Sequence, residues 1–152
     1  MPQSLSAVNL HAIFSTKNRE PWLLDRTLQD ETHAFLGNVS NKLDCPPVIV
    51  GGVADHVHIL ARLDRTITQS DWIKELKRVS RLWLKDKDPL RMTGFAWQAG
   101  FGVFSVSPSM LESVEKYIHG QEEHHRKLTF QDEFRQFLEK HQMTRDERYL
   151  WE

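Results

Sequence analysis

The 152-residue sequence is poor in several residue types, and each shortage excludes a class of protein. Its single cysteine, Cys45, excludes an intramolecular disulfide and a zinc site built from several thiolates, so we expect a cytosolic protein. Glycine (7) and proline (6) are too few for a collagen-like or low-complexity chain. No apolar run approaches the ~18 residues of a membrane span, and no basic region followed by a long apolar stretch opens the chain. We therefore expect neither a membrane protein nor a signal peptide.

Positive charge is not in excess either. Lysine and arginine number 20 and aspartate and glutamate number 21, which gives a net charge of −1. This balance excludes a globally basic nucleic-acid binder, so contact with nucleic acid must come from a local patch. The hydrophobic fraction of 39% is sufficient for a real core, and we expect a single domain over residues 1–152.

Hydrophobic periodicity and turn residues divide the chain into alternating strands and helices. The predicted elements are a strand from Ala7 to Phe14, a helix from Asp25 to Leu43, a hairpin of strands Val48 to Val53 and His56 to Leu63, a helix from Thr68 to Leu84, two short strands within Phe95 to Val106 bent at Ala99-Gly100, a helix from about Ser107 to His125, and a helix from Phe130 to His141. Asp25 and either Thr68 or Ser70 are the expected N-caps of the first two helices. Ser109 and Glu112 have the spacing of a capping box.

This order of elements predicts an α+β fold of the ferredoxin-like, split βαβ type. In that fold an antiparallel sheet carries helices on one face. The other face stays free for a ligand or for the added C-terminal helix, which bears Tyr117. The charged tail from Gln131 onward contains enough aromatic residues that we expect it to dock on the domain.

His56 and His58 stand in an apolar predicted strand, GGVADHVHILARL. Strand alternation points both imidazoles to one face and Val57 and Ile59 to the other. Imidazoles at i and i+2 are a common partial metal site, and a third ligand has to come from elsewhere. Two histidines that merely hydrogen-bond to the backbone are the competing interpretation of an isolated H-x-H.

Tyr117 and Gln121 lie one turn apart in EKYIHGQ and therefore share a helix face. If that face packs over the two histidines, Gln121 supplies an oxygen ligand and Tyr117 lies beside the metal, with the remaining positions open to phosphate oxygens. Taken alone, such a pair is usually an ordinary half-buried contact.

Basic residues repeat at i, i+3/i+4 spacing along one face of the second predicted helix, opposite the stripe formed by Trp72, Leu76 and Trp83. They are Lys74, Lys77, Arg78, Arg81 and Lys85, and Lys17 and Arg19 after the first strand extend the same surface. The pattern favours a DNA-binding surface, although a solvated helix face is the commoner meaning of such a run.

Packing or solvation explains several other candidate residues better than chemistry does. They are the histidine pair His124-His125, expected at a solvated helix end, the tail residue Tyr149, the buried thiol Cys45, and the aromatics Trp97, Phe101 and Phe104, at least two of which we expect in the core. His11 shows no partner pattern.

At these residues the sequence resembles the small single-tyrosine HUH transposases of bacterial insertion sequences and their relatives, the REP-associated tyrosine transposases. The similarity runs nearly end to end and is carried by HAIFSTKNREPW, GGVADHVHIL, FAWQAGFGVFSVS, SVEKYIHGQEEHHRKLTF and DERYLW. The resemblance implies a bacterial, cytoplasmic, nucleoid-associated enzyme without a small-molecule organic cofactor. One departure is Gly120, where the family often has asparagine; a glycine costs about 1 kcal/mol of helix stability and loosens the turn that positions Gln121.

Carried over residue by residue, the resemblance implies that His56, His58 and Gln121 bind a divalent ion, Mg²⁺ or Mn²⁺, and that Tyr117 is the nucleophile. The implied substrate is single-stranded DNA with hairpin, palindromic elements, cut through a 5′-phosphotyrosine intermediate and then rejoined. The family contains obligate dimers with shared sites as well as monomers, so a homodimer and a monomer both stay open.

Two other functions fit the same residues. A non-catalytic nucleic-acid-binding module would share the split βαβ fold. A metal-dependent phosphodiesterase that uses water would leave Tyr117 beside the metal without a covalent role. A covalent protein–DNA product distinguishes the transposase from both.

Overall fold

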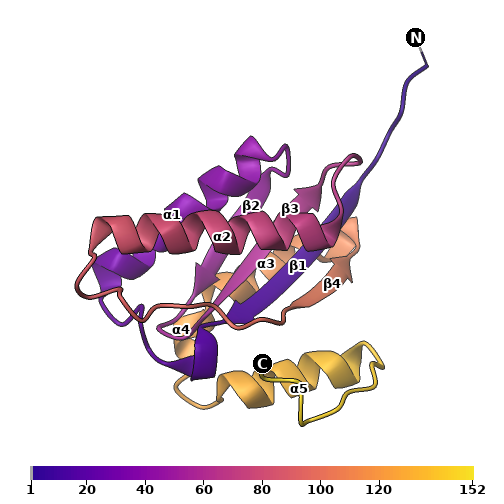
Figure 1. Ribbon diagram of the computed structural model, residues 1–152. Coiled ribbons are helices and arrows are strands. Elements are labelled where there is room, and N and C mark those ends of the chain that lie inside the picture. Colours follow the sequence, from indigo (N-terminus) through magenta and orange to yellow (C-terminus); the bar gives the residue numbers. More distant parts are fainter. Residues whose placement is uncertain (1) are drawn as a thin grey trace.

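The computed structural model describes residues 2–152 and contains a four-stranded antiparallel sheet with helices on both faces (Figure 1). The strands, in the spatial order β2-β3-β1-β4, are Pro47–Gly52, His56–Leu63, Val8–Ser15 and Gly102–Val106. The helices are α1 (Arg26–Lys42), α2 (Gln69–Lys87), α3 (Leu111–His119), α4 (Gln121–His124) and α5 (Phe130–Lys140), with short 3-10 turns η1 (Lys17–Arg19) and η2 (Pro108–Met110). This order of strands and crossovers confirms the predicted α+β, ferredoxin-like fold class.

The main core lies between the sheet and helices α1 and α2. Alternate residues of the two central strands point to this face, among them Phe14 on β1 and Val57 and Ile59 on β3. They pack against Leu36 of α1 and Leu76 of α2, and all five side chains are fully buried. The intervening residues of the same strands therefore face the opposite side of the sheet, where the site is built.

Side-chain caps fix where three helices begin. Asp25 accepts a hydrogen bond from the backbone N–H of Thr27 at the start of α1, and Thr68 accepts one from Asp71 at the start of α2. The cap at Asp25 was predicted, and Thr68 is one of the two residues predicted for α2. Thr129 caps α5 in the same way, through the N–H of Asp132 at 3.2 Å.

The second face of the sheet is covered by α3, as expected for the third helix, and also by α5, which belongs to the tail that was expected to dock. A second apolar cluster lies there, in which Phe130, Phe134 and Leu138 of α5 pack against Ile13 and Phe104 of the sheet. Figure 1 shows α3 on the side of the sheet opposite α2, with α5 next to the strands. The predicted docking of the tail is confirmed for Leu150 and Trp151, which pack on this cluster.

A glycine lets α3 approach the sheet closely. A Cβ atom at Gly51 of β2 would lie 2.8 Å from the side chain of Ile118 and 2.9 Å from its carbonyl oxygen. Ile118 is buried and stands between Tyr117 and the end of α3. The absence of a side chain at Gly51 therefore helps to set the position of the helix that carries Tyr117.

Three local predictions were wrong. Residues 95–106 contain a single strand, β4, and the segment before it makes only an isolated bridge between Trp97 and Thr16. The third helix does not run unbroken to His125, because Gly120 leaves helical geometry (φ −89°, ψ 16°) and separates α3 from α4. The expected capping box at Ser109 is replaced by the 3-10 turn η2.

Among residues 2–152, none of the helices combines the length and the apolar character that crossing a bilayer demands.

Candidate active site

The imidazoles of His56 and His58 point from β3 into the space between the sheet and helices α3 to α5. Both side chains are fully buried. Val57 and Ile59 point to the other face, as the strand alternation predicted. The two rings lie 5.2 Å apart between centroids, which brings their outer nitrogens to one place.

The structure brings Tyr117 and Gln121 to the same place, despite the break at Gly120. Gln121 is buried, and its Oε1 lies 3.2 Å from Nε2 of His56. The ring of Tyr117 lies 6.0 Å from that of His58. All four residues named by the sequence thus surround one point within a single chain.

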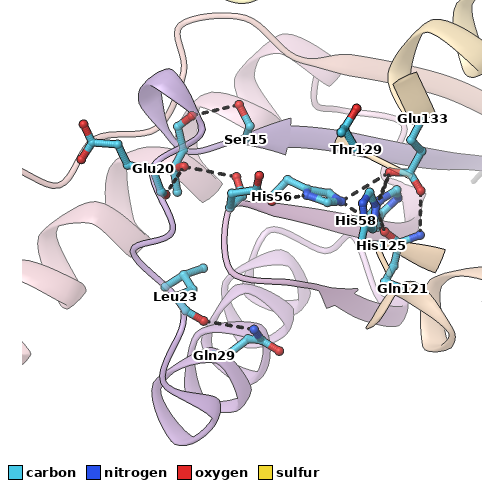
Figure 2. A network of polar contacts seen from close by, with 12 residues as sticks. Ser15, Glu20, Leu23, Gln29, His56, His58, Gln121, His125, Thr129 and Glu133 are labelled. Atoms are coloured by element: carbon cyan, nitrogen blue, oxygen red, sulfur yellow. Dashed lines mark hydrogen bonds and ion pairs between the residues drawn. The ribbon is translucent and has the colours of Figure 1, made fainter. Parts of the chain in front are cut away.

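Glu133 of α5 occupies the centre of this group, and the sequence analysis missed it. Its carboxylate lies 3.0 Å from Nε2 of His58, accepts a 3.0 Å hydrogen bond from the amide of Gln121, and accepts another from the hydroxyl of Tyr117. Figure 2 shows Glu133 facing His58, His125 and Gln121. The side chain is only 1% exposed. The signal was available, since Glu133 falls within the apolar stripe of its helix, at i+3 from Phe130.

His125 completes the cluster, contrary to the prediction of a solvated helix end. Its Nε2 lies 3.1 Å from Oε1 of Gln121 and 3.2 Å from the carboxylate of Glu133. His124, by contrast, is exposed and lies against the ring of Tyr117 at 4.6 Å between centroids. His125 stands four residues after Gln121 and therefore shares the helix face of that residue, whereas the adjacent His124 points elsewhere.

Polar partners hold the far sides of the two strand histidines. Nδ1 of His56 lies 2.7 Å from a carboxylate oxygen of Asp55, and Nδ1 of His58 lies 2.8 Å from Nε2 of His11. His11 therefore has a partner that its sequence context did not indicate. With Nδ1 engaged in this way, the Nε2 atoms of His56 and His58 face the centre, which is the orientation that metal-ligating histidines require.

The buried charges perturb the acid–base behaviour of the cluster. Burial lowers the pKa of His56, but hydrogen bonds to Asp55 and Glu133 outweigh it and raise the pKa to about 9. Burial dominates at His58 and lowers its pKa to about 4. Burial raises the pKa of Tyr117, and the neighbouring carboxylate raises it further. Burial alone would raise the pKa of Glu133, yet hydrogen bonds from the histidines hold it well below its usual range.

The donor set fits a divalent metal ion. One ligand atom from each of His56, His58, His125 and Glu133 lies within 4.8 Å of all the others. Ligands on opposite sides of an ion are about 4.2 Å apart, twice a bond of about 2.1 Å, so small side-chain movements would bring these atoms to bonding distance. Imidazole and carboxylate ligands suit first-row transition ions, and the oxygens of Glu133 and Gln121 also suit Mg²⁺.

α5 closes the site on one side, and a cavity remains next to the tyrosine. Tyr117 lines a cavity of about 310 Å³ between α3 and α5, together with His11, Val114, Phe137 and Lys140. The ligand atoms behind it are buried beneath α5. The ring of Tyr117 is therefore accessible from this cavity, whereas the side chains of His56 and His58 are fully covered.

The basic residues of α2 that the sequence named are either exposed to solvent or hydrogen-bonded to backbone carbonyls. Lys74, Arg78 and Arg81 are exposed along α2, and Arg78 pairs with Glu75 at 2.9 Å. Lys77 is half-buried and donates hydrogen bonds to the carbonyls of the 98–100 segment.

The other basic side chains lie at the ends of this surface. Lys85 donates to the carbonyl of Thr93 at 3.2 Å. Lys17 and Arg19 lie in η1, on the opposite side of the 96–99 segment from α2. The predicted basic residues therefore lie on both sides of that segment, and backbone carbonyls engage two of the lysines, Lys77 and Lys85.

The remaining candidates follow their predictions with one exception. Cys45 is buried, and Trp97 and Phe104 belong to the core while Phe101 is 37% exposed. Tyr149 does not pack as predicted, because its side chain is 61% exposed.

A family model described as Transposase IS200 like matches residues 4–121. A search of curated proteins finds no match. Among solved structures, a candidate transposase from Deinococcus radiodurans R1 is similar (22% identity, TM-score 0.63, 80% of this chain and 95% of that chain). So is a REP-associated tyrosine transposase bound to a REP hairpin (15% identity, TM-score 0.59, 82% of this chain and 72% of that chain).

The two structures support the fold, and the sequence match, which covers most of the chain, supports the family. The match ends at Gln121, so α5 and Glu133 lie outside it. This chain belongs to the IS200-like transposase family.

Proposed function

We propose that residues 1–152 form a single transposase domain that cuts and rejoins single-stranded DNA, with Tyr117 as the nucleophile. One observation carries the proposal: the hydroxyl of Tyr117 converges with two strand imidazoles and the amide oxygen of Gln121 on one buried point of a single chain. Packing alone does not explain why a tyrosine hydroxyl lies beside a set of metal-ligating groups.

His56, His58 and Gln121 would hold the divalent ion, Mg²⁺ or Mn²⁺, and His125 lies close enough to contribute. When bound, the ion would withdraw charge from the scissile phosphate and stabilise the leaving 3′-oxygen. Asp55 and His11 keep the imidazoles oriented through their Nδ1 atoms.

The tyrosine chemistry exchanges one ester for another. The hydroxyl oxygen of Tyr117 attacks the phosphorus, the bond from phosphorus to the 3′-oxygen breaks, and the phenol proton leaves as the 3′-hydroxyl forms. The product is a 5′-phosphotyrosine with a free 3′-hydroxyl. Because the ester is conserved, attack by another 3′-hydroxyl rejoins the strand without ATP.

Access to the site requires a change in α5. In the closed protein the carboxylate of Glu133 lies where phosphate oxygens have to meet the histidines, and the ligand atoms are buried. Withdrawal of Glu133 makes room for the phosphate and releases the hydroxyl of Tyr117 from its hydrogen bond. The cavity beside Tyr117 supplies the adjoining space.

Hairpin recognition is part of the proposal. The structural relative bound to a REP hairpin supports it, because its fold matches that of this chain. The basic surface of α2 and η1 supplies phosphate contacts on this side of the molecule.

The test is covalent attachment to a labelled single-stranded oligonucleotide in Mn²⁺, detected by denaturing gel electrophoresis. Tyr117→Phe keeps the ring that packs beside His11 and is expected to abolish the covalent band while retaining hairpin binding. Tyr149→Phe is the matched control, because this tyrosine is exposed in the tail, and it should attach normally. An active Tyr117→Phe protein would contradict the assignment. A free 5′-phosphate without a protein-bound product would favour the water-using phosphodiesterase.

A further inference from the structure

A groove of about 540 Å³ separates α2 from the 96–101 segment, the last part of the connection that runs from α2 to β4 (Figure 1). One wall carries cations and the other carries aromatic rings. Its principal lining residues are Lys74, Lys77, Arg78, Arg81, Trp97 and Phe101.

Lys77 connects α2 to the segment that carries the aromatic wall. Its ammonium group donates to the carbonyls of Gln98 (2.9 Å) and Gly100 (2.6 Å) and lies 5.1 Å and 5.5 Å from the ring centroids of Phe14 and Phe101. Burial lowers the pKa of Lys77 to about 8. The lysine therefore acts inside the protein, holding the segment so that Phe101 presents part of its ring to the groove.

Two cations at the rim remain available to a ligand. Within residues 2–152, Lys74 and Arg81 form no ion pair, whereas Arg78 is paired with Glu75. An exposed ring beside free cations is the arrangement by which proteins bind an unpaired strand, since the base stacks on the ring and the cations meet phosphates.

Two further grooves follow, and each shares lining residues with the groove before it. A second groove, of about 550 Å³, shares Ala96, Trp97 and Ala99 with the first. It adds the side chains of Lys17, Arg19, Arg148 and Trp151. Here Asn18 and Arg19 both adopt left-handed backbone (φ 57° and 56°), and the Arg19 guanidinium lies 5.9 Å from the Trp151 ring centroid.

A third groove, of about 560 Å³, shares Arg19 with the second. Its lining includes the cations Arg126 and Lys127 and the carboxylates of Asp55 and Asp132. His125 also lines it, and both His125 and Asp55 contact residues of the candidate active site. Cationic side chains outnumber acidic ones in the lining of each groove, although Arg126 and Arg148 are paired with Glu123 and Asp146. The shared residues join the grooves between α2 and the candidate active site.

We propose that these three grooves hold the unpaired strand of the DNA substrate, with a base stacked on Phe101 and phosphates beside Lys74 and Arg81. The proposal rests on the proposed function, which names DNA as the substrate, and it deepens that function by giving the strand a route. A base within a duplex cannot use Phe101, because both of its faces are already stacked.

Binding of fluorescein-labelled dT12, measured by fluorescence anisotropy in EDTA, tests the route without cleavage. Phe101→Ala is expected to weaken binding about tenfold with an unchanged salt dependence, and Phe101→Tyr to retain wild-type affinity. Arg81→Gln is expected to weaken binding and to lower the slope of log affinity against log salt by about 0.7. The controls Lys42→Gln on α1 and Leu90→Ala, at a side chain 92% exposed, should bind as the wild type does.

Wild-type affinity in both Phe101→Ala and Arg81→Gln would overturn the proposal, provided circular dichroism shows folded proteins. Equal competition by a blunt duplex of the same length, or tighter binding of rU12 than of dT12, would also overturn it. Because the assay needs no chemistry, its failure is distinct from failure of the proposed function. Loss of covalent attachment with intact binding would refute the tyrosine mechanism alone.

Discussion

Glu133→Gln tests how firmly α5 closes the site. The amide keeps the shape of the side chain but removes the buried negative charge that faces His58, His125, Gln121 and Tyr117. A hydrogen bond to a charged group contributes about 1.5–3 kcal/mol, and the amide retains part of the network, so we expect docking of α5 to weaken by about 2 kcal/mol. Since each 1.4 kcal/mol is a factor of ten, the population with α5 undocked rises about 30-fold.

Native-state hydrogen exchange measures this population directly, because amides of α5 exchange through the undocked state. We expect those amides to exchange about 30-fold faster in Glu133→Gln, while the amides of the central strands change little. Glu139→Gln is the matched control, because it makes the same chemical change on the same helix at a side chain that is 67% exposed.

The rate of covalent attachment separates two roles for Glu133. If the carboxylate only closes the site, single-turnover attachment to a labelled oligonucleotide becomes faster in Glu133→Gln. The reason is that the DNA phosphate no longer has to displace a carboxylate from the histidines. Unchanged exchange of α5 would refute the reasoning about docking. Faster exchange with loss of attachment would show that Glu133 takes part in the chemistry.

Three further predictions concern the metal, the packing of α3 and the completeness of the site. The pKa of His56 is about 9 in the folded protein and ~6.5 in the unfolded chain, so protonation of this ring stabilises the metal-free fold. The stabilisation is complete below pH ~6.5 and is lost as the pH rises through 9. Mn²⁺ needs the neutral ring, so calorimetry should show affinity rising about tenfold per pH unit from 7 to 9, and a flat profile would contradict this. Gly51→Ala should lower the free energy of unfolding by about 1–3 kcal/mol in chemical denaturation and slow attachment, whereas Gly37→Ala, with no neighbour nearer than 3.7 Å, should not destabilise. Mixing Tyr117→Phe with His56→Ala should restore no attachment, because one chain holds both groups; restored attachment would show sites shared between subunits.

The parts of the structure that follow from local periodicity were predictable. Alternation in β3 places His56 and His58 on one face whatever covers that face, and a single helical turn keeps Tyr117 and Gln121 together. The caps at Asp25 and Thr68 depend on only a few neighbouring residues, so they too could be recognised in the sequence.

The parts that depend on tertiary packing were not predictable in the same way. Glu133 reaches the site only because the aromatic side of α5 docks beside β1 and β4 and carries the carboxylate with it. His11 finds His58 through the pairing of β1 with β3, which places partners 47 residues apart in the chain. His125 shares the helix face of Gln121, four residues earlier, but its contact with Glu133 depends on the docking of α5, which local sequence does not place.

The most direct test of the central claim is to locate the covalent bond itself. After reaction with a labelled single strand in Mn²⁺, trypsin should release the peptide Tyr117 to Arg126, YIHGQEEHHR, which contains one tyrosine. Tandem mass spectrometry is expected to find a 5′-phosphonucleotide on Tyr117. A nucleotide on another residue, such as Tyr149, or DNA cut to a free 5′-phosphate with an unmodified peptide, would contradict the account.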